Sequence, residues 1–229
     1  MNFKAPVLTV DGPSGSGKGT VGLLLAQRLG WHFLDSGALY RAVGTTAVSQ
    51  KIDLSNRAAL VQLAEHIDIR FIPKAGDDLM AVMLNGEDVG DSLRTEESGR
   101  QASIVAAIPE VRQALLQKQH SFRQSPGLVA DGRDMGTTVF PDAILKIYLT
   151  ASAEVRADRR YKQLKDKGFD VNLRRLLDEI RERDVRDAER KASPLKPADD
   201  AHILDTSQLD ISGVVEQVYR LLQERQRRR

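Results

Sequence analysis

Apolar residues along this chain fall into short continuous runs that alternate with longer segments of helical spacing. The short runs are typical of strands buried on both faces of a parallel sheet, and they cover residues 7–10, 31–34, 128–130, 144–149 and 201–205. Helical spacing or capping signals cover residues 21–29, 36–50, 56–66, 95–104, 109–124, 153–167, 172–192 and 211–223. This alternation predicts a three-layer α/β/α fold around a five-stranded parallel sheet with right-handed crossovers.

One region departs from the alternation of strands and helices. Apolar and polar residues alternate with a period of two over residues 67–71 and 80–84, with a polar turn at 76–78 between them. Asn85-Gly86 is a strong hairpin signal, and residues 87–89 can begin a third strand. We therefore expect an antiparallel insert over about residues 67–93.

Composition narrows the class of protein. The chain has 229 residues, of which 41% are apolar, and this is enough for one sizeable core plus an insertion. There is no cysteine, so disulfides and thiolate metal sites are excluded. The start of the chain lacks a signal-peptide pattern and no apolar run approaches membrane-spanning length, so we expect a cytoplasmic protein without a membrane partner.

Charge argues against a role in binding nucleic acid. The formal net charge is only +2, and part of the positive excess is terminal, in Arg225, Arg227, Arg228 and Arg229. These arginines follow the last helical pattern, and we expect a frayed, solubilising end there. An arginine-rich end still leaves a nucleic-acid-associated ATPase as an alternative, which the weak charge and the absence of a guanine-binding Asn-Lys-x-Asp motif oppose.

A glycine-rich segment follows the first strand and has P-loop spacing. Gly12 is followed after four residues by Gly17-Lys18, and a helical pattern begins directly afterwards. Main-chain N–H groups of such a loop surround a phosphate chain, while the helix N-terminus and the lysine add positive charge. The predicted donor-phosphate residues are Gly12, Pro13, Ser14, Gly15, Ser16, Gly17, Lys18, Gly19 and Thr20. The segment predicts binding of a nucleoside triphosphate.

The P-loop departs from the common motif at one position. The common motif has Ser or Thr directly after the lysine, whereas here Gly19 follows Lys18 and the hydroxyl comes one residue later, at Thr20. The displaced hydroxyl suggests a contact with Mg²⁺ through water. Two further polar segments, Asp35-Ser36 and residues 131–133, also follow predicted strands, so all three are expected to meet at one edge of the sheet.

Four motifs together resemble the bacterial cytidylate kinases, members of the nucleoside monophosphate kinase family. They are the P-loop, Leu-Asp-Ser-Gly-Ala-Leu-Tyr-Arg at 34–41, Asp-Gly-Arg-Asp-Met-Gly-Thr at 131–137, and Arg-Asp-Val-Arg-Asp at 183–187. The resemblance extends from about residue 6 to residue 206. It implies phosphorylation of CMP and dCMP by ATP with Mg²⁺, by a monomer of pyrimidine metabolism. A kinase for another acceptor such as UMP remains the alternative within this class.

The resemblance also implies roles for individual residues. It assigns the acceptor phosphate to Arg41, Arg133 and Arg190, and cytosine recognition to Ser103, Arg112 and Asp134. It assigns the ribose to Arg183 and Asp187, and closure of the acceptor pocket to Ser36 and Tyr40. Lys18, Arg133 and Arg190 would act on the transferred group.

On the donor side, the resemblance assigns Arg156 and Arg160, one helical turn apart, to the phosphates and adenine of ATP. The alternative is that these arginines are surface charge on an amphipathic helix. No direct magnesium ligand is assigned, and Thr20 and Asp131 are candidates through water. Asp131 has a second interpretation, as a residue at the strand end that holds the P-loop.

Three regions are expected within one chain. The core covers about residues 1–36, 95–155 and 171–229, the monophosphate-binding region with the insert about 37–94, and a short helical lid about 157–170 with Gly168 able to act as a hinge. Arg183, Asp187 and Arg190 are spaced to share one face of the helix predicted over residues 172–192. Without the resemblance, the many charged neighbours favour a solvated, salt-bridged helix face there.

Overall fold

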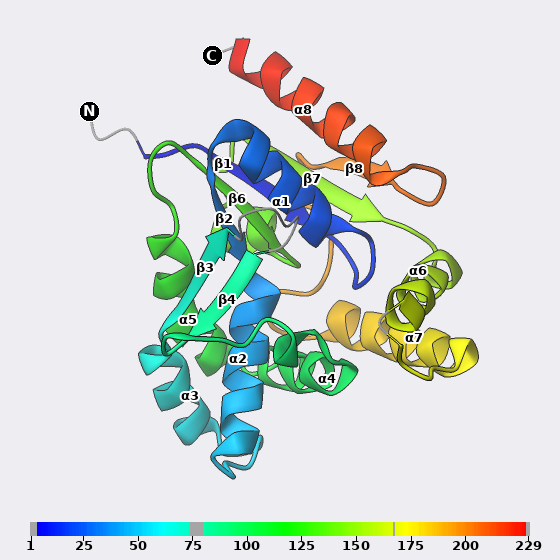
Figure 1. The fold of residues 1–229 in the computed structure, drawn as a ribbon. Coiled ribbons are helices and arrows are strands. Elements are labelled where there is room, and N and C mark those ends of the chain that lie inside the picture. Colours follow the sequence, from blue (N-terminus) through cyan, green and yellow to red (C-terminus); the bar gives the residue numbers. More distant parts are fainter. Residues whose placement is uncertain (1–3, 74–79, 167, 228–229) are drawn as a thin grey trace.

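The computed structural model describes residues 4–73, 80–166 and 168–227 of the chain. Its centre is a five-stranded sheet in which all neighbouring strands are parallel (Figure 1). The strands are β1 (Val7–Asp11), β2 (His32–Asp35), β6 (Leu128–Gly132), β7 (Leu145–Thr150) and β8 (His202–Asp205). Their order across the sheet is β2-β6-β1-β7-β8. The predicted α/β class and the five-stranded parallel sheet are confirmed.

Helices cover both faces of this sheet. The helices of the described residues are α1 (Lys18–Leu29), α2 (Ser36–Ser49), α3 (Arg57–His66), α4 (Glu96–Val105), α5 (Pro109–Ser121), α6 (Ala153–Asp166), α7 (Leu173–Glu189) and α8 (Ile211–Arg227), of which α6 and α7 pack on each other and not on the sheet. Successive strand residues enter different cores: Val7 belongs to the core with α2, α3 and α5, whereas Leu8 belongs to the core with α1 and α8. This alternation explains why the strands read as continuous apolar runs.

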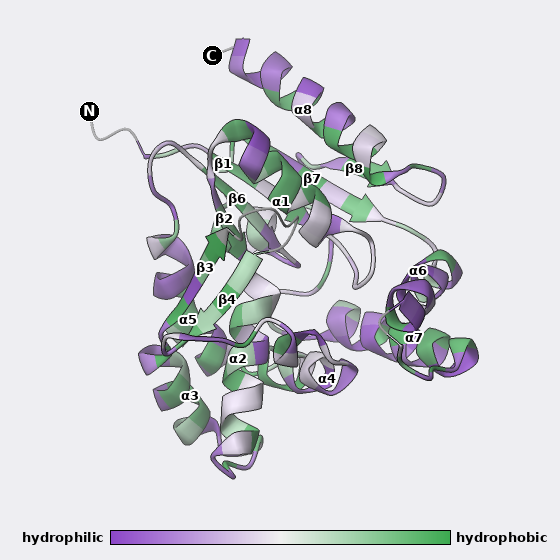
Figure 2. Cartoon of the chain, viewed as in Figure 1, coloured by the Kyte–Doolittle hydropathy of each residue, from purple (hydrophilic) through white to green (hydrophobic). Residues whose placement is uncertain are grey.

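The predicted helix starts are confirmed at their caps. Asp35 accepts a hydrogen bond from the Ala38 N–H at 3.0 Å, and Thr95 accepts one from the Ser98 N–H at 3.1 Å. Asn172 caps α7 in the same way, through the Arg175 N–H. Each side chain satisfies a main-chain donor that the helix itself leaves unpaired. In Figure 2, α8 shows alternating green and purple along its length, as expected for a helix with one face against the core.

A second, antiparallel sheet forms the predicted insert. It contains β3 (Ile69–Pro73), β4 (Met80–Leu84) and β5 (Glu87–Asp88), in that order. Asn85 and Gly86 have positive φ angles of 50° and 90°, the conformation that a tight hairpin requires. The Phe71 ring contacts the Phe33 ring of the main sheet edge-on, with centroids 6.5 Å apart. The predicted turn at 76–78 lies outside the described residues.

The end of α7 differs from the prediction, and α5 also ends early, at Ser121 instead of about residue 124. α7 ends at Glu189 instead of 192, and Arg190 is extended, with φ −59° and ψ 130°. The chain turns back here because the Leu195 N–H donates to the Asp187 carbonyl at 2.8 Å. Arg190 therefore lies beyond the helix, and its predicted place on the same helix face as Arg183 and Asp187 is wrong.

The C-terminal end is more ordered than the sequence suggests. α8 continues to Arg227, so the prediction that it ends near residue 223 is wrong. Arg225 belongs to the helix and donates to the Ile144 carbonyl at 3.3 Å, which joins the helix to the main sheet. The expected frayed end therefore begins after Arg227 at the earliest, and residues 228–229 lie outside the described residues.

The single tryptophan lies at the start of β2. The indole of Trp31 covers the main chain of Gly127, where an added Cβ would approach the ring to 2.4 Å. Glycine is therefore required at position 127. Trp31 precedes β2 and Asp35 ends it, so the two residues lie at the amino and carboxyl ends of the parallel strands, respectively.

Candidate active site

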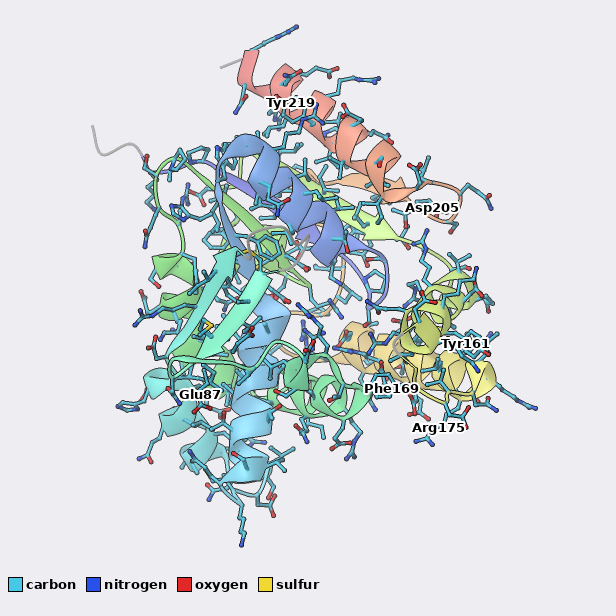
Figure 3. The ribbon with its side chains drawn as sticks, viewed as in Figure 1. Glu87, Tyr161, Phe169, Arg175, Asp205 and Tyr219 are labelled. Carbon is cyan, nitrogen blue, oxygen red and sulfur yellow. The ribbon has the colours of Figure 1, made fainter. Side chains whose placement is uncertain are left out.

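A cavity of about 560 Å³ opens at the carboxyl ends of the central strands. Its walls bring together the P-loop, the Asp35-Ser36 segment and the loop after β6, which confirms their predicted convergence. The rest of the wall comes from the antiparallel sheet, from α4 and α5, and from α6 and α7. The outward-facing labelled side chains in Figure 3, such as Tyr161 and Arg175, do not line it.

Lys18 occupies the P-loop side of the cavity. Its side chain is only 7% exposed, and Nζ donates to the Pro13 carbonyl at 3.0 Å. Burial and then the nearby Arg133 lower the pKa of Lys18 to about 7. The surroundings therefore disfavour the charged form of Lys18, and an anion that binds beside it would be stabilised by the lysine.

Most of the predicted P-loop residues face the cavity, but three do not. Gly12, Pro13 and Ser16 are buried under the loop, whereas the other six line the wall: Ser14, Gly15, Gly17, Lys18, Gly19 and Thr20. Two of these buried residues still help to hold the loop. The Pro13 carbonyl accepts a hydrogen bond from the Lys18 ammonium, and the Ser16 carbonyl accepts one from the Thr206 hydroxyl at 3.3 Å.

The glycine after the lysine has a physical reason. A Cβ added at Gly19 would lie 3.2 Å from Oδ2 of Asp131, so the carboxylate takes the space that a serine or threonine would need. Asp131 is 6% exposed, and burial followed by the charge of Asp35 raises its pKa, while Lys18 opposes that rise. Its carboxylate and the Thr20 hydroxyl both reach the cavity wall. These hard oxygen donors suit Mg²⁺.

Outside this pair, the described residues hold no group of three or more His, Cys, Asp or Glu side chains that could bind a metal.

The side of the cavity opposite the P-loop contains buried ion pairs. Arg112 of α5 donates to Asp134 in the loop after β6, and the two side chains are 9% and 3% exposed. The Arg112 guanidinium lies 5.4 Å from the centre of the Tyr40 ring. Burial raises the pKa of Tyr40 to about 12, so its hydroxyl remains protonated at neutral pH. Ser103 lies in the same wall, and its buried hydroxyl has no hydrogen-bond partner among the described residues.

A second ion pair joins α7 to the loop after β6. Nε of Arg133 donates to Asp187 at 2.9 Å, and both side chains are largely buried. Arg133 and its neighbour Arg41 help to lower the pKa of Arg183, to about 9, although burial is the larger cause. Burial and then Arg112 lower the pKa of Arg190 as well. Cations that disfavour one another in a confined space form a strong site for a phosphate group.

The structure brings all ten predicted acceptor residues to this cavity. Its wall contains Ser36, Tyr40, Arg41, Ser103, Arg112, Arg133, Asp134, Arg183, Asp187 and Arg190. Arg41 lies 3.8 Å from Asp35, and Arg190 still reaches the cavity although it lies beyond α7. These residues come from segments far apart in the sequence.

The two predicted lid arginines differ in position. Arg160 lines the cavity, where it donates to Glu96 at 2.6 Å and to the Arg94 carbonyl at 2.7 Å. Arg156 does not line the cavity: its side chain is 4% exposed and ion-paired with Asp184. A direct contact of Arg156 with ATP stays a prediction, and the burial of Arg156 against Asp184 argues against it.

Several wall residues were not anticipated. Arg159 lines the cavity and donates to the Thr206 hydroxyl at 3.1 Å, and Glu96 lines it where it accepts from Arg160. The cluster of arginines at 156–160 was the signal for Arg159. The apolar part of the wall, from Phe33, Phe71 and Met80, had no such signal, because it arises where the insert packs on the core.

The glycine-rich loop has P-loop spacing, joins a buried strand to a helix at the carboxyl edge of a parallel sheet, and faces an arginine cluster. These features define the class as a P-loop kinase. The family model described as cytidylate kinase matches residues 8–224. This chain belongs to the cytidylate kinase family. It is therefore a phosphotransferase that uses ATP as its phosphate donor.

Individual relatives agree with this assignment. A cytidylate kinase from Pseudomonas aeruginosa (strain UCBPP-PA14) is 59% identical over 220 residues, which cover 96% of each chain. A cytidylate kinase from Pseudomonas putida (strain W619) is 57% identical over 225 residues, covering 98% of this chain and 99% of that one. Among solved structures, an uncharacterized protein from Eubacterium ventriosum has a TM-score of 0.52 at 9% identity, covering 96% of this chain and 99% of the other, and it shares the fold alone.

Proposed function

We propose that this chain transfers the terminal phosphoryl group of ATP to CMP and dCMP, forming CDP and dCDP in pyrimidine nucleotide metabolism. The observation that carries the proposal is the buried Arg112–Asp134 pair beside the unpartnered Ser103 hydroxyl, in the same cavity as the P-loop. A carboxylate accepts from the exocyclic amine of cytosine, and the serine and arginine donate to its ring oxygen and nitrogen. Uracil has a carbonyl where cytosine has the amine, and it would face Asp134 with a second acceptor.

In the proposed reaction, an oxygen of the acceptor phosphate attacks the terminal phosphorus of ATP. The new P–O bond forms as the bond to the leaving oxygen of ADP breaks, so the electron pair leaves with ADP. Lys18, Arg133 and Arg190 would neutralise charge on the moving group, with Arg41, Arg133 and Arg190 holding the acceptor phosphate. Their shared cavity and the arginine cluster support this division of roles.

The remaining roles complete the substrate contacts. Arg183 and Asp187 would bind the ribose, while Ser36 and Tyr40 close the acceptor pocket. Arg160 would reach the donor phosphates. Mg²⁺ would be held through water by Thr20 and Asp131, and when bound it neutralises the outer phosphates of ATP. The oxygen donor set and the close approach of Asp131 to Gly19 support this site.

The division into a core, a monophosphate-binding region over about 37–94 and a lid over about 157–170 is part of the same proposal. The antiparallel sheet and the α6–α7 hairpin, which both contribute to the cavity wall, support it. We further propose a cytoplasmic monomer that acts on nucleotides and does not bind nucleic acid. Within the described residues, no helix has the length and apolar character needed to cross a membrane.

The test is initial velocity with Mg-ATP against CMP, dCMP, UMP, AMP and GMP. Preferential phosphorylation of CMP and dCMP is expected. Preference for another acceptor would keep the kinase and overturn Ser103, Arg112 and Asp134 as cytosine-reading residues. Absence of acceptor phosphorylation, together with steeply salt-dependent RNA binding, would instead favour a nucleic-acid-associated ATPase.

A further inference from the structure

Three carbonyl groups of the P-loop accept hydrogen bonds from side chains. The Pro13 carbonyl accepts from Lys18, the Ser14 carbonyl accepts from Nη1 of Arg156 at 3.0 Å, and the Ser16 carbonyl accepts from Thr206. Two of these donors, Arg156 and Thr206, lie far from the loop along the chain, and Arg156 is the one that belongs to the α6–α7 hairpin. Figure 1 shows the α6–α7 hairpin beside the loop that precedes α1.

Arg156 is held firmly enough to direct that peptide group. Its Nε donates to the Ala151 carbonyl at 2.9 Å, and both terminal nitrogens donate to Asp184 of α7. The planar guanidinium therefore has fixed partners on two sides, and its fork geometry suits the carboxylate. Its Cβ also lies against the loop, 3.2 Å from where a Cβ on Gly15 would be.

The orientation of this peptide group matters for phosphate binding. In a trans peptide, the carbonyl and the following N–H point in opposite directions. Arg156 lies outside the cavity, whereas Ser14 and Gly15 line it, so holding the Ser14 carbonyl outward turns the Gly15 N–H toward the cavity. A preset N–H donor costs no rearrangement when the phosphates arrive.

We propose that Arg156 and Asp184 act as positioning residues for ATP, by fixing the peptide between Ser14 and Gly15 in its phosphate-binding orientation. Asp184 acts through Arg156, since it supplies the counter-charge that keeps a buried guanidinium in place. This inference rests on the proposed use of the P-loop for ATP. It replaces a direct contact of Arg156 with the nucleotide.

The chain provides a matched control for the pair. Glu154 of α6 and Arg181 of α7 form a second ion pair between the same two helices, at 2.7 Å, but both side chains are exposed and neither lines the cavity. If the Arg156–Asp184 pair only held the hairpin together, breaking either pair would have similar consequences. A positioning role predicts that only the first affects ATP.

The experiment is calorimetric titration of the full chain with Mg-ATP, without acceptor, and separately with CMP. Asp184→Asn is expected to weaken ATP binding about tenfold, the loss typical of a hydrogen bond to a charged group, with a much smaller effect on CMP. Glu154→Gln is expected to leave both affinities unchanged. Equal losses in the two variants would overturn the proposal.

The sign of the change separates positioning from direct contact. If Arg156 bound ATP itself, Asp184→Asn would release it, and ATP would bind as tightly as before or more tightly; that result in a folded variant also overturns the proposal. Arg156→Lys is the second variant, because lysine keeps the charge but cannot reach Ala151, Ser14 and Asp184 together. It is expected to weaken ATP binding selectively, and unchanged ATP binding would contradict the proposal. The proposed function has a separate readout. Absence of CMP phosphorylation by the wild-type chain would refute that function, whereas the ATP titrations would still test the role of Arg156 and Asp184.

Discussion

The two sides of the cavity are built in different ways. The P-loop side is one continuous segment, residues 12–20, whose main chain is directed by contacts to its carbonyl groups. The opposite side is made of side chains from α2, α4, α5, α7 and the loop after β6. A phosphate chain is recognised by main-chain N–H groups, whose orientation depends on the glycines and on the contacts to the loop carbonyls, whereas a base and a sugar require particular side chains.

The two sides also differ in electrostatics. On the P-loop side Lys18 has a lowered pKa, so positive charge is incomplete until an anion arrives. On the opposite side two arginines are already paired, Arg112 with Asp134 and Arg133 with Asp187, although burial also lowers the pKa values of Arg183 and Arg190. Removing one member of such a buried pair leaves the other uncompensated. The comparison predicts that removing Lys18 on the P-loop side reduces turnover, whereas removing a base-facing residue such as Asp134 on the opposite side reduces selectivity.

The largest effect is expected for Lys18→Ala. Removing the ammonium next to the transferred group is expected to lower kcat about a thousandfold, because charge stabilisation is most of what phosphoryl transfer needs. Steady-state kinetics with Mg-ATP and CMP measure it. The control is Lys162→Ala, which removes an exposed lysine of α6 and is expected to retain full turnover. Near-normal turnover of Lys18→Ala would contradict the P-loop assignment.

A large but selective effect is expected for Asp134→Ala. Loss of the acceptor for the cytosine amine is expected to reduce the preference for CMP over UMP about a hundredfold, with little change in KM for ATP. The ratio of kcat/KM for the two acceptors measures it. Asp142→Ala, which breaks the more exposed pair with Arg123, is the control and should preserve the preference. An unchanged ratio in Asp134→Ala would remove Asp134 from base recognition.

The electrostatic difference predicts proton uptake on the P-loop side. Burial lowers the pKa of Lys18, and the negative charge of ATP raises it again, so binding at a pH above the lowered value takes up a proton. Up to about one proton per ATP is expected from this linkage. Calorimetry in buffers of different ionisation enthalpy measures it. CMP, whose phosphate is assigned to Arg41, Arg133 and Arg190, is the comparison ligand, and equal uptake with CMP and ATP would contradict the stated asymmetry.

The smallest effect is expected at the contact that joins the two sides. Glu96→Gln weakens the ion pair that holds Arg160 against α4, so the arginine is freer to reach the donor phosphates. KM for ATP is expected to fall about twofold, since partly exposed ion pairs contribute little. Glu97→Gln, which affects the neighbouring contacts with Arg100 and Gln101 and not Arg160, should leave KM unchanged. A rise in KM for ATP in Glu96→Gln would show that the closed contact itself assists binding.

The sequence predicts best those features that are local. The P-loop, the caps at Thr95 and Asn172, and the hairpin at Asn85-Gly86 all depend on residues within a few positions of one another, and all are present. The period-two pattern also located the insert, because alternation alone distinguishes it from the buried parallel strands.

Features that depend on tertiary contacts were predicted less well. The spacing of Arg183, Asp187 and Arg190 indicated one helix face, but the helix ends before Arg190, where a main-chain hydrogen bond to Leu195 takes over. Arg156 and Arg160 have similar sequence surroundings. Only the fold shows that Asp184 and the Ser14 carbonyl hold the first, while the second faces the cavity. No local pattern carries the identity of a partner so far away in the chain.

The position of Trp31 has a spectroscopic consequence. As the single tryptophan, it dominates the intrinsic fluorescence, and it is fixed over Gly127 at the edge of the sheet away from the cavity. Its emission should therefore report the unfolding of the core and remain nearly constant on addition of nucleotides. The wild-type chain thus carries an optical reporter of stability, and a tryptophan placed in the cavity wall of a Trp31→Phe background would provide one for ligands.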